Sequence, residues 1–406
     1  MAAPSEANPE FLMKIVFYCQ ESAPATIDNY LSIGASGTVS ALVLASHGLA
    51  KLGHEVVVLN QSESGVYQGA RHLQTRSAEE AIAHLGGLGA VDVFVANGWA
   101  ADIFLKHQVP ASKKVYWVHN FVDQKPFEDA IREGRLDYIF CISLNQLGTW
   151  YRSPVFTRIT RIYNCIDTAV IDRIPAAAVR EKKIMFIGAP RESKGFHDAL
   201  RVFDAFARRN PGYVMYVAGT ADLHGSATAL SDKGIFEKDY EEKYLSALLK
   251  DADGNPRKDL VLLGRLSREE VLTHLANTRV ALQNPSWTSQ PEVHSVSALE
   301  AQAMGVPVVS TFRGGQPEVV EDGVTGILAK KKGDDCLVEA LERIVRDEQL
   351  ANSMSSKARE HVMTRFTVPA IAADWDRAVR EVVAGKRFHG NLFRALRSKV
   401  RHKLHV

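Results

Sequence analysis

Short runs of apolar residues alternate with longer amphipathic stretches along most of this chain. In the first half, six runs have the length and apolar character of buried strands: 14–19, 55–60, 91–97, 114–120, 138–143 and 158–164. The stretch 37–53 has helical spacing of its apolar residues and ends at Gly53. This alternation predicts a parallel sheet whose strands are joined by crossover helices.

The pattern begins again after a polar, alanine-rich segment, 168–182, which is expected to be an interdomain linker. Five further strand-like runs follow it: 183–188, 213–219, 260–264, 280–284 and 306–311. Two successive series predict two doubly wound α/β domains, over 13–175 and 176–367. In such sheets ligands bind at the carboxyl ends of the strands, so the residues that directly follow each strand are the first candidates for a site.

Composition is typical of a globular protein of two domains. A chain of 406 residues is too long to fold around one ordinary hydrophobic core. Its residues are 46% hydrophobic and 24% charged, as in soluble globular proteins. Each apolar run is shorter than the roughly 20 residues that cross a bilayer. The four cysteines, Cys19, Cys141, Cys165 and Cys336, include no C-x-x-C pair. This spacing disfavours a disulfide framework or a zinc site and fits the reducing cytoplasm.

The two ends of the chain differ from its body. Residues 1–12 are small and polar, and we expect a disordered leader or a cloning remnant. Residues 386–406 hold seven Lys and Arg and no acidic residue, so the rest of the chain is mildly acidic and nucleic-acid binding is unsupported. Apolar residues recur every fourth position in this tail, which predicts a basic amphipathic helix on an anionic membrane surface. A helix packed on the first domain or a disordered end are the alternatives.

The segment 291–310, PEVHSVSALEAQAMGVPVVS, carries the strongest chemical signal. Glu292 and Glu300 are eight residues apart, and a helix is expected to end at Gly305. Eight helical residues would separate the two carboxylates by about 12 Å. They can therefore share one ligand only if Glu292 lies in the loop before the helix. The helix N-terminus would then offer backbone N–H groups to a diphosphate.

This segment resembles the E-x7-E motif of the family 4 glycosyltransferases. The residues after it, TFRGGQPEVVEDGVTGILA, are similar to the family's G-G-x-x-E continuation, and 187–196, 261–286 and 34–59 resemble its donor-site strand, nucleotide-side segment and glycine loop. The resemblance covers most of 14–385. It implies a GT-B fold, with two Rossmann-like domains that face a central cleft. The first domain would bind the acceptor and the second the nucleotide sugar, and a helix at 368–385 would cross back to the first.

The resemblance also implies a set of site residues. The catalytic candidates are His119 and Glu292, and the donor-binding candidates are Gly37, Arg191, Lys194, Leu266, His294, Ser295, Val296 and Glu300. Glu300 would hydrogen-bond the donor ribose and Glu292 would contact the transferred sugar. Lys194 and Arg191 would neutralise the diphosphate leaving group. No nucleophile, metal or cofactor is implied.

Three departures from the family pattern concern the donor site. Ala189 stands where the family has an arginine, so Arg191 is the candidate to replace it; 293–295 replaces the usual glycines and phenylalanine; and 36–38 replaces a double glycine. These changes leave the donor sugar unassigned.

Several candidates have plain structural alternatives. Ser297 and Glu300 have capping-box spacing, so Glu300 could tie down a helix end. Glu292 could be a solvated loop carboxylate, Lys194 part of an ordinary turn and His119 a polar strand cap. Asp251 and Asp253 lie in a polar stretch and are interpreted as a turn rather than a metal site.

The expected function is retaining transfer of a hexose-type unit from a UDP- or GDP-sugar. The expected acceptor is lipid-linked or a polysaccharide or lipopolysaccharide, in cell-envelope or exopolysaccharide biosynthesis. The expected location is the cytoplasm, or the inner face of its membrane through 386–406. A non-catalytic nucleotide-sugar-binding scaffold and a nucleotide-sugar epimerase are the alternatives. A dinucleotide oxidoreductase is disfavoured because no G-x-G-x-x-G follows the strand at 14–19.

Overall fold

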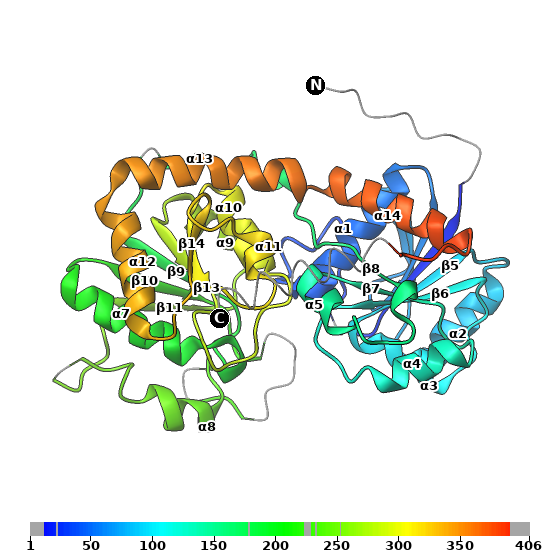
Figure 1. Cartoon of the computed structure of the whole chain (residues 1–406), viewed down its shortest axis with the longest axis horizontal. Helices are drawn as coiled ribbons and strands as arrows, with labels where there is room; N and C mark the ends of the chain where they lie inside the picture. The colour runs from blue at the N-terminus through cyan, green and yellow to red at the C-terminus, as the bar shows by residue number, and fades with distance from the viewer. Residues whose placement is uncertain are drawn as a thin grey trace.

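The computed structural model describes residues 12–389, except for 22, 178, 223–228, 232–233 and 252. The expected leader up to residue 11 and the tail from 390 onward lie outside the described residues, so the expectations about both remain predictions. Two α/β domains lie side by side, each built around one sheet (Figure 1).

The first sheet has eight strands in the order β3-β4-β2-β1-β5-β6-β7-β8. Their bounds are β1 Lys14–Cys19, β2 Glu55–Asn60, β3 Gly65–Tyr67, β4 Ala70–Gln74, β5 Val93–Asn97, β6 Lys113–Val118, β7 Tyr138–Cys141 and β8 Ile159–Arg161. All neighbours are parallel except β3 and β4. The sequence did not predict β3 and β4, because these two strands are only partly buried and so lack an apolar run.

The second sheet has six parallel strands in the order β11-β10-β9-β12-β13-β14. Their bounds are β9 Lys183–Ile187, β10 Val214–Ala218, β11 Leu260–Gly264, β12 Val280–Leu282, β13 Val308–Thr311 and β14 Gly326–Ala329. Strand order reverses between β1 and β5 in the first sheet and between β9 and β12 in the second. Ligands bind at such switch points, so the loops after these four strands are the ones that position a site.

Helices cover both faces of each sheet (Figure 1). Those up to the domain connection are α1 Gly37–Lys51, α2 Ala78–Gly87, α3 Ile103–Lys106, α4 Lys125–Arg132, α5 Leu144–Thr149 and α6 Thr168–Ile171. The later helices are α7 Phe196–Arg209, α8 Lys238–Tyr240, α9 Arg268–Ala276, α10 Val296–Ala303, α11 Gln316–Val319, α12 Asp334–Arg346, α13 Glu348–Arg365 and α14 Val368–Val383. One apolar core contains residues of both sheets, for example Ile15 and Met185, so the domains share buried surface.

The last helix, α14, packs on the first domain rather than on the second (Figure 1). Its Trp375 is fully buried, with ring centroids 5.4 Å from Phe17, 4.8 Å from Trp117 and 5.4 Å from Phe140. Such aromatic pairs stabilise by about 0.5–1.5 kcal/mol beyond the area they bury. Residues from the end of the chain therefore complete the core of the domain that begins it.

The α1–α14 contact depends on Gly48. A Cβ at this position would lie 2.8 Å from Ala372 Cβ and 3.1 Å from Val368 Cγ1. We expect Gly48→Ala to lower the free energy of unfolding by about 1–2 kcal/mol, because overpacking outweighs the better helix propensity of alanine. Urea unfolding checks this. The control is Gly86→Ala in α2, which meets nothing within 4 Å and should stabilise by about 0.5 kcal/mol. Equal shifts in both variants would contradict the close approach.

Candidate functional site

A cleft of about 810 Å³ lies between the two domains, at the carboxyl ends of their strands. It is lined by all ten residues that the sequence singled out: Gly37, His119, Arg191, Lys194, Leu266, Glu292, His294, Ser295, Val296 and Glu300. Two come from the first domain and eight from the second. The structure therefore brings together, in one place, residues that are far apart in sequence.

Glu292 lies in the loop before α10, the position that it must occupy if Glu292 and Glu300 bind one ligand. Gly314 and Gly315 hold this loop from behind. The Gly315 N–H donates to Glu292 O over 2.7 Å, and a Cβ on Gly315 would lie only 1.7 Å from Val293 O. A Cβ on Gly314, whose φ is +58°, would lie 2.2 Å from Glu292 O. The two glycines that follow β13 are therefore required for the backbone path of the glutamate loop.

Lys194 ends a short 3-10 helix, Glu192–Lys194, that follows β9. The next residue, Gly195, has φ +64°, and a Cβ there would lie 2.3 Å from Ser286 Cβ. The lysine loop thus packs directly on the loop that leads to Glu292. The Lys194 Nζ donates to Glu292 Oε1 over 2.6 Å, and the two side chains are 41% and 17% exposed. A cation and a carboxylate are therefore held together at an accessible wall of the cleft.

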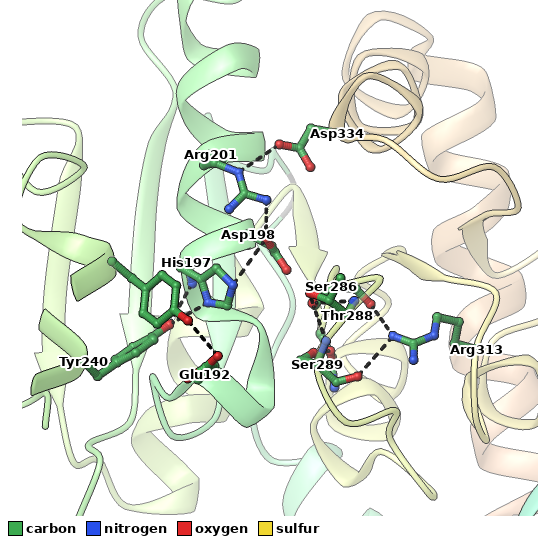
Figure 2. A network of polar contacts seen from close by, with 12 residues as sticks. Glu192, His197, Asp198, Arg201, Tyr240, Ser286, Thr288, Ser289, Arg313 and Asp334 are labelled. Carbon is green, nitrogen blue, oxygen red and sulfur yellow. Dashed lines mark hydrogen bonds and ion pairs between the residues drawn. The ribbon is translucent and has the colours of Figure 1, made fainter.

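Further polar contacts hold both of these loops (Figure 2). Arg313 Nη1 donates to Ser286 O over 2.9 Å and to Ser289 O over 3.2 Å. Tyr244 Oη donates to Glu192 Oε1 over 2.8 Å, which anchors the lysine loop. The His197 N–H at the start of α7 donates to Tyr240 Oη over 2.9 Å. The loops that carry Lys194 and Glu292 are therefore held by these hydrogen bonds as well as by the ion pair between the two side chains.

Glu300 is buried on α10 and forms an ion pair with Arg268. Burial raises the pKa of Glu300, and the Arg268 guanidinium acts in the opposite direction. The capping-box alternative is wrong, because Ser295 is the N-cap of α10 and accepts from the Ala298 N–H over 3.2 Å. The Ser297 hydroxyl instead donates to Gln283 Oε1 over 3.0 Å. Glu300 is thus free of any capping duty.

The N-termini of α1 and α10 meet at the cleft, one from each domain. Gly37 begins α1, and a Cβ there would lie 3.5 Å from Val296 Cγ2 at the start of α10. Ser36 caps α1 by accepting from the Val39 N–H over 3.2 Å. Each helix end presents unpaired backbone N–H groups and the positive end of its dipole. Together with Lys194, this arrangement favours an anion such as a diphosphate.

His119 and His294 are buried at the cleft in neutral form. Burial lowers the pKa of His119 to about 4, against the opposing charge of Glu21. Burial also lowers the pKa of His294 to about 3, helped by Arg161. The His294 ring stacks on Tyr163 of the first domain with centroids 4.9 Å apart. Among the described residues, no hydrogen-bond partner reaches His119 Nε2, which leaves this nitrogen available to a ligand.

These histidines predict a pH dependence of stability. In the unfolded chain the pKa of His294 is near the ordinary value of 6.5, whereas in the folded protein this pKa is about 3. Between these values the unfolded state binds more protons, so stability falls as pH falls. We expect the melting temperature to drop between pH 6.5 and 4, and to drop less in His294→Phe, which keeps the ring stack. His84→Gln, at a partly exposed helix position, is the control and should follow the wild type. Identical pH profiles for His294→Phe and the wild type would contradict the burial of a neutral His294.

Arg191 lines the cleft, but its guanidinium is also engaged within the second domain. It donates to Ala221 O and lies 3.3 Å from Glu237 Oε1. Whether it substitutes for the arginine missing at Ala189 therefore stays a prediction.

Three residues at or beside the cleft were missed by the sequence reasoning. Arg268 pairs with Glu300 across 32 residues of sequence, and no local pattern signals such a contact. Trp99 follows β5 directly, so the rule that sites lie after strands would have found it. Glu318 belongs to the G-G-x-x-E segment, which was noted without a role.

Glu318 links the two domains. From α11 of the second domain, its carboxylate accepts from the Leu144 N–H over 2.6 Å and the Asn145 N–H over 2.8 Å, at the start of α5 in the first domain. It also accepts from Tyr163 Oη over 2.9 Å. Burial raises the pKa of Glu318, while these three donors lower it. This buried carboxylate is a polar connection between the walls of the cleft.

Within the described ranges, no group of three or more His, Cys, Asp or Glu side chains could hold a metal ion. Asp251 instead closes a turn, accepting from the backbone N–H groups of Asp253 and Asn255 over 3.0 and 2.9 Å. In the same part of the chain, no helix combines the length and apolar character needed to cross a bilayer.

A family model described as Glycosyl transferases group 1 matches residues 167–361. The chain is 26% identical over 234 residues to glycogen synthase from Mycobacterium tuberculosis. The aligned region covers 57% of this chain and 50% of that one. Over 120 residues it is 35% identical to D-inositol 3-phosphate glycosyltransferase from Mycobacterium marinum, covering 28% and 26% respectively. The matches thus span about half, or less, of the length of these curated relatives.

Solved structures match over almost the whole fold. Sucrose-phosphate synthase from Thermosynechococcus elongatus has a TM-score of 0.71 and 15% identity, covering 92% of this chain and 100% of that one. Anabaena HepE in complex with UDP-glucose has a TM-score of 0.68 and 16% identity, covering 91% and 100%. At such identities the likeness establishes the fold alone. The two-domain GT-B architecture predicted from the sequence is confirmed.

Proposed function

We propose, from the match of residues 167–361 to the family model of glycosyl transferases group 1, that the protein is a glycosyltransferase that uses a nucleotide diphosphate sugar. The observation that carries the proposal is the meeting of two helix N-termini with Lys194, Glu292 and Glu300 in one cleft. Nucleotide sugars supply both groups that this arrangement suits, a diphosphate and a polyhydroxylated sugar.

Each residue has a role in this proposal. Lys194 and the N–H groups of α1 and α10 bind the diphosphate and stabilise the charge that grows on it as the glycosidic bond breaks. Glu300 accepts hydrogen bonds from the ribose hydroxyls, held in place by Arg268. Glu292 accepts from hydroxyls of the transferred sugar. His119, neutral and with Nε2 available, contacts the sugar from the first domain.

The finer assignment concerns stereochemistry, donor and acceptor. We propose that transfer retains the anomeric configuration, that the donor is a UDP- or GDP-hexose, and that the acceptor is a glycan or glycolipid of the cell envelope. Its support is the family resemblance and, for a lipid-anchored acceptor, the basic amphipathic pattern of 386–406. HepE, a structural neighbour of the same fold, was solved with UDP-glucose.

A donor screen tests the proposal. Thermal shift with UDP, GDP and their common sugar derivatives should reveal one that raises the melting temperature, because a ligand of the native state stabilises it. The same donor with a membrane and polysaccharide extract should release a nucleotide diphosphate. Binding without release, unchanged in Glu292→Ala, would favour the scaffold alternative, and a new nucleotide sugar formed without acceptor would favour the epimerase. No binding and no release with any donor would refute the proposal.

A further inference from the structure

Trp99 is an exposed aromatic residue inside the cleft. It lies in the 3-10 helix Gly98–Asp102 after β5, and 74% of its surface is exposed. Large exposed hydrophobic side chains among the described residues are Leu12, Val66, Trp99, Val179, Leu230 and Val383. Of these, Trp99 alone lines the cleft. Aromatic side chains commonly line ligand sites, so an exposed tryptophan in the candidate cleft is a candidate ligand contact.

The backbone that carries Trp99 is firmly anchored. Gly98 has φ +56°, and a Cβ there would lie 3.4 Å from Thr38 Cγ2 on α1. Asn97 Nδ2 donates to Thr38 O over 3.3 Å, and Ala100 and Ala101 are 1% exposed. The turn is therefore fixed on both sides of the tryptophan. Its indole is presented to the cleft by a rigid support, which reduces the entropy lost on binding.

The surroundings of Trp99 distinguish between possible ligands. Strands β5 and β6 pair in parallel, with Asn97 opposite Trp117. Trp99 and the segment 119–121 therefore follow the carboxyl ends of two neighbouring strands. The first-domain side of the cleft mixes the polar side chains of His119, Asn120 and Glu21 with the apolar side chains of Phe121 and Ile142, so it is not continuously apolar. An acyl or prenyl chain requires a continuous apolar channel, whereas a pyranose ring has an apolar C–H face bordered by hydroxyls.

We infer that Trp99 is the stacking platform for a sugar ring at the reacting end of the acceptor. The C–H face of the ring covers the indole, and the ring hydroxyls bind the polar groups beside it. This inference rests on the proposed function and deepens it, since it assigns the acceptor to the saccharides. Trp99 stands on the first-domain wall, facing a donor held mainly by the second.

Saccharide binding can be measured directly at Trp99. Trp117, Trp150 and Trp375 are buried and Trp287 is partly buried, so acrylamide quenching reports on Trp99 and to a smaller extent on Trp287. Subtraction of the Trp99→Phe signal isolates the contribution of Trp99. The probes are methyl glycosides of glucose, galactose, mannose and N-acetylglucosamine, with and without UDP, and dodecylphosphocholine below its micelle concentration. We expect at least one glycoside to protect Trp99 from quenching, and the alkyl probe not to. Protection by the alkyl probe alone, or by no glycoside up to 100 mM, would overturn the inference.

Variants supply the second measurement. Trp99→Ala should weaken binding of that glycoside, followed by saturation-transfer NMR, by about tenfold or more, whereas Trp99→Phe should stay within about threefold. Val66→Ala, an equally exposed position on β3, is the control. UDP binding should be unchanged in all three variants. Unchanged glycoside binding in Trp99→Ala would refute the inference alone. Trp99-dependent glycoside binding without any nucleotide binding would leave Trp99 as a saccharide platform, but would refute the proposed function and with it the acceptor role.

Discussion

Replacing Lys194 by methionine is expected to lower kcat for sugar transfer by about a hundredfold to a thousandfold, with little change in melting temperature. The lysine is a cation that pairs with Glu292 in the cleft that the N-termini of α1 and α10 also line, where we propose that the diphosphate leaving group gains charge. Stabilisation that acts mainly in the transition state appears in kcat more than in donor affinity. Because the side chain is 41% exposed, folding does not depend on it. Steady-state rates and thermal unfolding of the variant check both expectations.

The matched control for this experiment is Lys330→Met. Lys330 is 42% exposed and also forms an ion pair with a carboxylate, Asp322, at 2.8 Å, but it does not line the cleft. It should keep full activity. A Lys194→Met protein as active as the Lys330→Met protein would exclude Lys194 from stabilising the leaving group.

Removing the carboxylate of Glu318 is expected to have the largest effect on stability. Glu318→Ala leaves the Leu144 and Asn145 N–H groups without an acceptor in a buried interface. Each unsatisfied group costs roughly 1–3 kcal/mol, so we expect a loss of about 2–4 kcal/mol in the free energy of unfolding. Urea unfolding measures it. Because the hydrogen bonds of Glu318 join the two domains that form the cleft, donor affinity should fall as well. Isothermal titration with UDP would detect this loss.

Glu321→Ala serves as the control for Glu318. Glu321 is three residues away, 59% exposed, and lies 3.8 Å from His361. Surface pairs of this kind contribute only about 0–1 kcal/mol. If the two alanine variants unfold alike, the interdomain hydrogen bonds of Glu318 do not stabilise the protein.

Sequence patterns predicted those elements that are buried on both faces. The predicted run at 14–19 is β1 and that at 55–60 is β2, because central strands of parallel sheets are continuously apolar. Strands β3, β4 and β14 escaped prediction, since β3 and β4 are only partly buried and β14, at the edge of the second sheet, is only four residues long. Helix ends were displaced by a residue or two, as for α1, which ends at Lys51 rather than Gly53.

For the candidate site, the sequence predicted which residues gather but not how they pair. Motif spacing located Glu292, Lys194 and Glu300 around one cleft. The ion pair between Glu300 and Arg268 depends on how α9 and α10 pack, and this is a tertiary contact that no local pattern encodes. The capping-box interpretation failed for the same reason, because Ser295, two residues before Ser297, is the N-cap of α10. Local rules propose several partners, and packing selects among them.

The position of α14 also affects how this chain can be synthesised. Domains generally fold as they leave the ribosome, the N-terminal one first. Here the first domain lacks Trp375 until the second domain has been translated, so Phe17, Trp117 and Phe140 lack the ring that packs on them during that interval. A nascent chain that ends before α14 should therefore expose an aromatic surface. Such a surface is a natural target for chaperones, and the final step of folding must wait for the last helix.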